Sequence, residues 1–101
     1  MERKMKILHL TLEKKWFDMM VKGEKDVEYR SKKPYWKKRL EHPNGMFIIF
    51  DEIHFRNGYK KNNPFMRRKH ETTYMTSWLG GEVYALNLGK ILELKNYGGK
   101  K

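Results

Sequence analysis

Residues 23–30 read Gly-Glu-Lys-Asp-Val-Glu-Tyr-Arg and mark a change from helix to strand. The opening glycine suits the left-handed position at which helices commonly end. The last five residues alternate, and successive side chains of a strand point to opposite faces. The alternation places Glu28 and Arg30 together on one face of the predicted strand. Val27 and Tyr29 take the opposite face.

The residues before this stretch predict a strand and an amphipathic helix. In residues 6–12 leucines alternate with polar residues, which is typical of a strand with one buried face. The helix is expected between Thr11, as the N-cap, and Gly23. At about 100° per residue its apolar side chains fall on one arc, so Trp16 and Phe17 are expected to belong to the core.

The residues after it predict a second helix and then mostly strands. Residues 31–40 are expected to form a short helix with Pro34 in its first turn, and residues 42–45 break it as a turn. The continuous apolar run 46–50 is typical of a strand buried on both faces. The Asn57-Gly58 pair predicts a tight turn, because both residues tolerate positive φ.

Further strands are expected over residues 65–75, 83–88 and 91–94, with a turn region at 77–81. Two short helices followed by several strands predict an α+β fold with a mostly antiparallel, barrel-like sheet flanked by the helices. All 101 residues are expected to form one domain. A short tail at about residues 97–101 is ordered only if something holds it.

The composition is that of a strongly basic globular domain. Hydrophobic residues make up 39% of the chain and aromatic residues 14%, which is enough for a core. Lys and Arg number 23 against 12 Asp and Glu, a formal net charge of +11. Such an excess favours a nucleic-acid or nucleotide partner, because neutralising phosphates supplies affinity that does not depend on sequence. The alternative is that the basic surface only aids solubility.

Several classes of protein are excluded or disfavoured by what the sequence lacks. With no cysteine there is no disulfide framework and no thiolate metal site, which fits a reducing compartment, so a cytoplasmic location is expected. No apolar run approaches the ~20 residues needed to span a membrane. The histidines lack metal-ligand spacing, and no phosphate loop, haem or flavin signature is present, so neither a metal nor a cofactor is expected.

The polar side chains of residues 23–30 have the chemistry of an anion or nucleotide site. Arg30 offers a planar fork for phosphate or for the acceptor edge of a base. Glu28 can accept from an exocyclic amine, act as a base or hold Arg30 in place. Lys25 can contact phosphate, or act as a nucleophile if desolvation lowers its pKa. The alternative from spacing alone is that Glu28 and Arg30 form only a structural ion pair.

Two further basic clusters are candidates for contact with an anion. Residues 35–39 interleave aromatic and basic groups, a mixture that stacks bases and neutralises phosphates. Trp36 is assigned to the core, and anion contact is assigned to Lys37, Lys38 and Arg39. Residues 67–70, Arg-Arg-Lys-His, are expected to form a solvent-facing strand or loop edge that extends the electrostatic track.

Three stretches resemble ASCH domains of the PUA-like superfamily. Residues 23–30 match the G-x-K-x-x-E-x-R signature of that family, residues 55–59 resemble the FRNGY stretch of its small phage-type members, and residues 88–91 resemble their closing LGKI segment. The resemblance implies a PUA-like barrel with a cleft between the barrel and its helices, and a function linked to RNA. It also adds Arg56 and Tyr59 to the candidate binding residues.

Three hypotheses of function remain open. The first is an RNA-binding module whose basic cleft holds RNA or a nucleotide. The second is a small hydrolase using the same cleft, with Lys25 and Glu28 as catalytic residues. The family includes ribonucleases and an amidohydrolase of N4-acetylcytidine, but the amidohydrolase branch has threonine where this chain has Glu28. The third is a basic factor that contacts an acidic protein.

Overall fold

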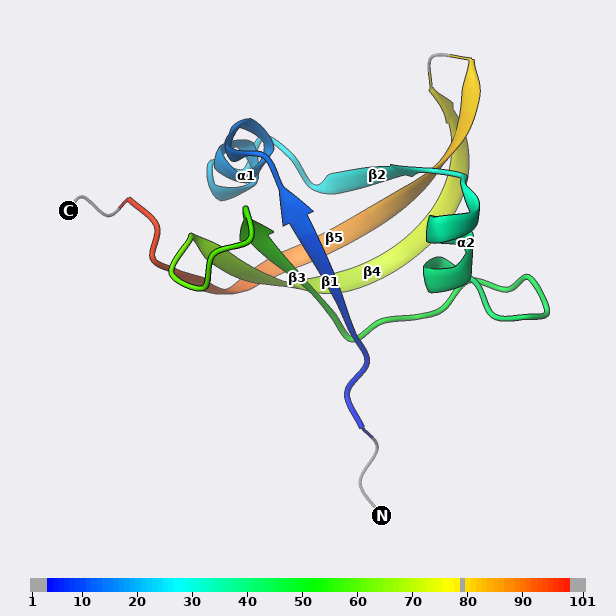
Figure 1. Cartoon of the computed structure of the whole chain (residues 1–101), viewed down its shortest axis with the longest axis horizontal. Coiled ribbons are helices and arrows are strands. Elements are labelled where there is room, and N and C mark those ends of the chain that lie inside the picture. The colour runs from blue at the N-terminus through cyan, green and yellow to red at the C-terminus, as the bar shows by residue number, and fades with distance from the viewer. Residues whose placement is uncertain (1–3, 79, 99–101) are drawn as a thin grey trace.

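The computed structural model describes residues 4–78 and 80–98, which form an α+β fold of one sheet and two helices (Figure 1). The elements in chain order are β1 (Ile7–Leu12), α1 (Lys14–Val21), β2 (Val27–Ser31), α2 (Pro34–Leu40), β3 (Glu52–Asn57), β4 (Phe65–Trp78) and β5 (Gly81–Lys95). The predicted α+β class is confirmed. In Figure 1 the β4–β5 hairpin bends upward at the right, α2 lies beside this bend, and α1 lies toward the other end of the sheet.

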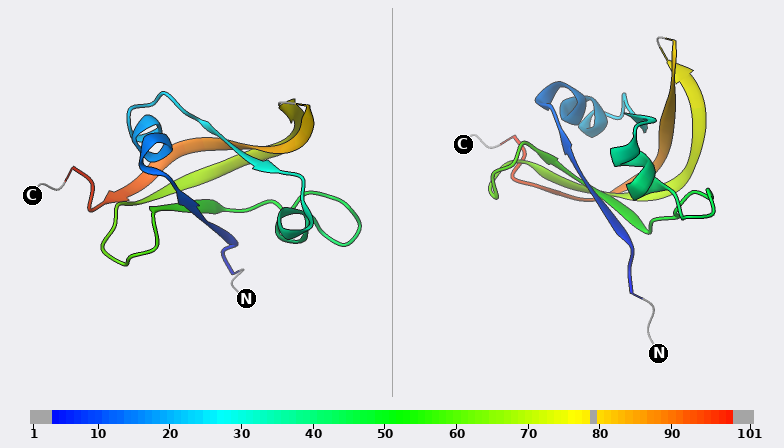
Figure 2. Two further views of the ribbon diagram at one scale, coloured as in Figure 1. Left: turned by 45° about the horizontal axis from the view of Figure 1, so that its top comes forward. Right: turned by 45° about the vertical axis from the view of Figure 1, so that its right-hand side comes forward.

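The sheet is mostly antiparallel, as predicted, but it is open. Its strand order is β1-β3-β4-β5-β2; β1 pairs with β3 in parallel, and the other three ladders are antiparallel. Within residues 4–78 and 80–98 no ladder joins β1 to β2, so these strands are the two edges of a strongly curved sheet rather than neighbours in a closed barrel (Figure 2).

The β4–β5 hairpin is longer than the sequence predicted. The two short strands expected at 83–88 and 91–94 are one strand, and β4 continues to Trp78, past the predicted end at residue 75. Three register shifts between Arg67 and Thr72 accommodate the bend of the hairpin. Gly89 permits this geometry, because a Cβ there would lie 3.1 Å from the Lys69 Cβ and would collide with the Glu71 carboxylate.

The prediction of a buried strand at 46–50 is wrong, because within the described residues 4–78 no strand lies between α2 and β3. Only an isolated bridge between Glu41 and Phe47 forms there, and Ile49 is 77% exposed while Phe50 is buried. The Phe50 N–H donates to the ring of His70 at 3.1 Å, so a side chain takes the place of a partner strand. An apolar run is therefore equally compatible with a strand and with an extended connection in which only single side chains are buried in the core.

Helix α1 begins later than predicted, and fewer of its apolar side chains are buried than expected: among residues 14–21 only Phe17 and Met20 are fully buried. Its N-cap is Glu13, because β1 continues through Leu12 and keeps Thr11 in the strand. It ends as predicted, before Gly23 with φ +80°. Phe17 is buried as expected, whereas Trp16 is 38% exposed, which contradicts its assignment to the core.

The core lies between the concave face of the sheet and the two helices. Leucines of β1, Phe17 and Met20 of α1, and Leu40 of α2 meet there. Pro34 starts α2 at its first turn, as predicted, and Trp36 is partly buried against the core. Tyr84 is fully buried and donates to Glu41 at 2.6 Å. Burial and this hydrogen bond raise the pKa of the Tyr84 phenol.

The β3–β4 connection and the C-terminal tail differ from the predictions made from the sequence. β3 and β4 are joined by residues 58–64, so Asn57-Gly58 opens a longer loop instead of forming a two-residue turn. The predicted tail at 97–101 is held at its start: the Tyr97 ring stacks on Phe17, with ring centroids 5.8 Å apart, and its hydroxyl donates to Asp18 at 3.0 Å. The rest of that tail, residues 99–101, lies outside the described residues. No helix within the described part of the chain is long and apolar enough to cross a membrane.

Candidate functional site

The candidate site lies along β2, an edge strand whose outer side has no partner in the sheet. The Asp26 carbonyl accepts from the Leu88 N–H at 2.9 Å, and the Lys32 N–H donates to the Glu82 carbonyl at 3.2 Å. Even-numbered residues of this strand therefore bond to β5, because backbone groups of a strand alternate in direction. The odd-numbered residues, including Tyr29, present their N–H and C=O groups to the open edge.

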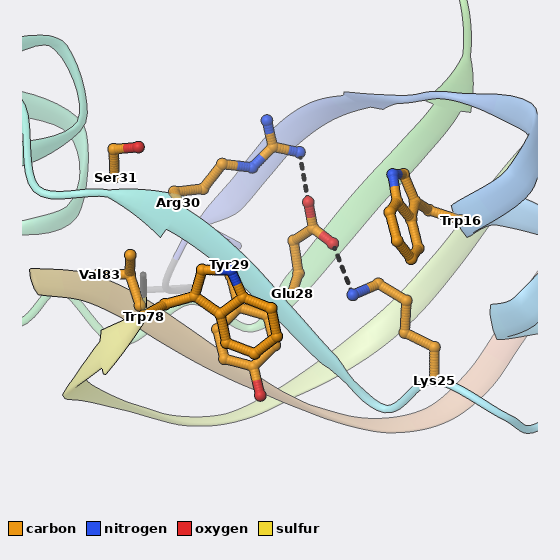
Figure 3. Close-up of a pocket in the computed structure, with 8 residues that line it drawn as sticks. All are labelled: Trp16, Lys25, Glu28, Tyr29, Arg30, Ser31, Trp78 and Val83. Atoms are coloured by element: carbon orange, nitrogen blue, oxygen red, sulfur yellow. Dashed lines mark ion pairs between the residues drawn. The ribbon is translucent and has the colours of Figure 1, made fainter. Parts of the chain in front are cut away.

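Glu28 lies between two cations at the centre of this site. It is 6% exposed, and its Oε1 and Oε2 atoms lie 3.3 Å from Lys25 Nζ and 2.7 Å from Arg30 Nη2 (Figure 3). The structure thus brings together the three residues predicted from the 23–30 stretch, with Glu28 and Arg30 on one face as expected. Two cations and one carboxylate leave one uncompensated positive charge, which favours an anionic ligand.

Arg30 also connects the two edges of the open sheet. Its Nη2 atom donates to the Thr11 carbonyl of β1 at 3.3 Å while pairing with Glu28 on β2. Its buried Nε atom has no hydrogen-bond partner in the described structure. The Arg30 guanidinium therefore occupies the gap at which a closed barrel would pair β1 with β2.

Three aromatic rings surround the ion pairs. We call the space they enclose the edge cavity; it has a volume of about 340 Å³ and is lined by Trp16, Lys25, Glu28, Tyr29, Arg30, Ser31, Trp78 and Val83. Tyr29 and Trp78 stack with centroids 5.7 Å apart and an interplanar angle of 27°. Lys25 Nζ lies between this pair and the Trp16 ring, 5.4 Å from the Tyr29 centroid and 5.3 Å from the Trp16 centroid (Figure 3).

The aromatic walls are what sequence reasoning missed. The sequence pattern assigns Trp16 to the core, Tyr29 to the strand face opposite Glu28, and Trp78 to the turn region at 77–81. Tyr29 does face away from Glu28, but β2 is an edge, so the cavity wraps around the strand and both faces line it. The position of Trp78 beside the Gly80-Gly81 pair at the hairpin tip was the available signal, since a tip seldom buries a large ring.

Arg68 fixes the loop that carries Lys25. It is buried, and its guanidinium donates to the Lys25 carbonyl at 3.0 Å, to Asp26 Oδ1 at 2.9 Å and to the Gly89 carbonyl at 2.7 Å. These bonds join the start of the 23–30 stretch to the bulged region of β5. Arg68 thus positions the edge cavity without lining it.

The predicted solvent-facing cluster at 67–70 is wrong for Arg68 and His70, whereas Lys69 is exposed on the strand as expected. Arg68 and His70 are buried, and Arg67 pairs with Glu52 at 2.7 Å and Glu93 at 2.8 Å. Burial lowers the pKa of His70, whose ring accepts from the backbone. The pairing with Arg67 is the largest cause that lowers the pKa of the Glu52 carboxyl. The alternation of β4 places Arg68 and His70 on the same buried face as Met66.

The basic residues of α2 do not reach the edge cavity. Lys37 pairs with Glu41 at 2.9 Å, and the Arg39 guanidinium lies 3.7 Å from the centroid of the Tyr35 ring. Lys37 and Lys38 line a separate pocket beside the turn at 42–45. These side chains extend the positive surface without belonging to the site around Glu28.

Arg56 and Tyr59, the two residues added by the resemblance, line a common pocket between β1, β3 and the 58–64 loop, but neither lines the edge cavity. Arg56 Nη1 donates to the carbonyls of Lys61 at 2.7 Å and Asn63 at 3.1 Å, so it holds the 58–64 loop. Tyr59 is 91% exposed and lines a cavity of about 590 Å³ that we call the second cavity. Its walls include His9, Thr11, Arg30, Tyr35, Trp36 and Tyr59. Arg30 is the residue shared by this cavity and the edge cavity.

Two histidines lie on the outer side of β1 and β3. The rings of His9 and His54 meet edge to face with centroids 5.2 Å apart, and His54 Nε2 lies 2.8 Å from Glu52. Burial and the neighbouring His54 lower the pKa of His9. Among the residues that the structure describes, no group of three or more His, Cys, Asp or Glu side chains is placed to hold a metal ion.

Comparison with known proteins finds no matching family model, no matching curated protein and no matching solved structure. The chemistry of the site is therefore inferred from its own residues. Stacked rings suit a flat aromatic group, and a carboxylate and two cations suit a polar edge or a phosphate. An edge strand adds backbone donors and acceptors at the same place.

Proposed function

We propose that the edge cavity binds a nucleobase of RNA, and that the protein is an RNA-binding module of the ASCH type with a PUA-like fold. One observation carries the proposal: a buried carboxylate between two cations lies beside three aromatic rings at an open strand edge. The resemblance of residues 23–30 to the ASCH signature supports it independently.

The aromatic rings supply the stacking that single-stranded RNA recognition requires. Trp16 and Trp78 are 38% and 58% exposed, so a large part of each ring remains accessible to a ligand at the cavity. A base that stacks on such a ring contributes about 1–3 kcal/mol to binding, and every base offers a flat face. Exposed rings gathered around charged groups are typical of sites for unpaired bases.

The polar groups supply orientation and charge. Glu28 keeps acceptor capacity beside its two ion pairs, since an ionised carboxylate has about four lone-pair sites. It can accept from the exocyclic amine of a base, while Lys25 and Arg30 contact phosphate. The net charge of +11 raises the local concentration of any polyanion and adds affinity that does not depend on sequence.

Trp78→Ala is expected to weaken binding of a labelled single-stranded RNA about tenfold, because it removes one stacking surface. Trp78 lies at an exposed hairpin tip, so the melting temperature should stay close to that of the wild type. Tyr74→Ala is the matched control: Tyr74 is a similarly exposed ring on the same strand, and it does not line the edge cavity. Equal losses in the two variants, measured by fluorescence anisotropy, would count against the edge cavity.

The same titration tests the electrostatic part of the proposal. The Lys25–Glu28–Arg30 group carries one net positive charge, and Lys15, whose ammonium lies 4.6 Å from the centroid of the Trp16 ring, adds another. If these charges neutralise roughly two phosphates, raising salt from about 50 to 200 mM should lower the wild-type affinity about sevenfold. Binding that is indifferent to salt would contradict a contact with phosphate. Electrophoresis of the recovered RNA distinguishes the module from a ribonuclease: a binding module returns the strand intact, and cleavage would assign the hydrolase function instead.

A further inference from the structure

The geometry points to a second nucleotide subsite in the second cavity, so that the ligand is an RNA chain of at least two nucleotides rather than a free nucleoside. This inference rests on the proposed function of the edge cavity. It assigns a role to Arg30 as the residue between two consecutive bases, and to Tyr35 and Tyr59 as the rings that receive the second base.

The two cavities meet at Arg30. On one side its Nη2 atom pairs with Glu28 of the edge cavity at 2.7 Å. On the other side its guanidinium lies 5.0 Å from the ring centroid of Trp36, which lines the second cavity. A ligand that fills both cavities must therefore cross the Arg30 guanidinium.

The charge at this crossing fits the phosphate between two nucleotides. Lys25 and Arg30 together exceed Glu28 by one positive charge, and an internucleotide phosphate carries one negative charge. Within the described residues, the contacts of the Arg30 guanidinium with Glu28 and with the Thr11 carbonyl both use Nη2, which leaves Nη1 for a phosphate oxygen. An arginine that is only partly committed to a carboxylate is suited to bind a phosphate oxygen as well.

The second cavity has the aromatic surfaces that a second base needs. Tyr59 is 91% exposed and Tyr35 is 56% exposed. Tyr35 is held in place by edge-to-face contact with Trp36, centroids 4.8 Å apart, and by the guanidinium of Arg39 on its ring. At about 590 Å³ the cavity is larger than the edge cavity, which holds about 340 Å³. Both lie within the range of volumes typical of small-molecule sites.

The test compares a nucleoside 5′-monophosphate with the 5′-phosphorylated dinucleotide of the same base, using adenine, cytosine and uracil pairs. Dissociation constants are measured from tryptophan fluorescence for the wild type, for the double variant Tyr35→Ala/Tyr59→Ala, and for its control Tyr35→Phe/Tyr59→Phe. Both tyrosines are exposed, so the variants are expected to fold. The quantity of interest is the ratio of the two dissociation constants within each protein.

We expect the dinucleotide to bind about tenfold more tightly than the monophosphate in the wild type and in the phenylalanine control, for at least one base. In the alanine variant the ratio should fall to about twofold, the gain that two equivalent bases give by chance alone. A wild-type ratio near two, or an unchanged ratio in the alanine variant, overturns the second subsite and leaves the proposed function standing. If neither ligand binds the wild type, both the proposed function and the second subsite are wrong.

Discussion

Phe17→Ala is expected to lower the free energy of unfolding by about 3–5 kcal/mol, whereas Trp16→Ala, one residue earlier, should leave most of the stability in place. Phe17 is 1% exposed and belongs to the main core, so its truncation leaves a cavity. The Trp16 ring is 38% exposed and lies beside the edge cavity. Urea denaturation of the two variants measures the difference directly.

The order of the two variants should be reversed in an RNA-binding assay, in which Trp16→Ala loses affinity and Phe17→Ala does not. Trp16→Ala removes a stacking surface and should weaken RNA binding about tenfold. The folded fraction of Phe17→Ala should bind like the wild type, because Phe17 does not line the edge cavity. If Trp16→Ala destabilises the protein as much as Phe17→Ala and binds RNA normally, the aromatic wall has been assigned to the wrong side of α1.

Glu28→Gln is expected to destabilise the protein by about 3 kcal/mol, because it leaves Lys25 and Arg30 without their shared counter-charge while nearly preserving the shape of the side chain. The value is at the lower end of the range for a broken buried pair, since both cations remain partly exposed. Glu82→Gln is the matched control. Its pair with Lys32 is a surface contact at 3.5 Å, and its loss should cost about 1 kcal/mol or less.

The ligand preference of Glu28→Gln separates a structural pair from a binding group. If the carboxylate accepts from an exocyclic amine, the folded variant should lose its preference for bases that carry such an amine over uracil. Titration with the three homopolymeric RNAs of adenine, cytosine and uracil measures this preference. Unchanged preference together with lost stability would show that Glu28 serves only the fold.

Local patterns predicted the elements that the chain determines locally. The alternation of residues 26–30 placed Glu28 and Arg30 on one face of a strand, and the structure confirms it. Pro34 and Gly23 marked the start of α2 and the end of α1, because each requires a particular backbone conformation. The gathering of Lys25, Glu28 and Arg30 followed from their short separation in the sequence.

The features that were missed depend on distant partners. The apolar run 46–50 has no strand beside it, and His70 on β4 takes the bond that a strand would take. Residues 83–94 form one strand because β4 runs alongside with compensating register shifts. The burial of Arg68 depends on carbonyls of Lys25 and Gly89, which no local pattern brings together. The exposure of Trp16 likewise depends on β2 being an edge strand.

The most direct test of the edge cavity as an RNA site uses the three tryptophans of the chain. Their indole N–H groups give separate NMR signals, and Trp→Phe variants assign each one. Titration with a short single-stranded RNA at low salt is expected to shift the signals of Trp16 and Trp78 progressively and to saturation, because both rings line the cavity. The backbone amide signals recorded in the same spectra report on the exposed basic residues, such as those of α2. If RNA binding shifts only these amide signals and leaves the indole signals of Trp16 and Trp78 unchanged, the edge cavity is not the site.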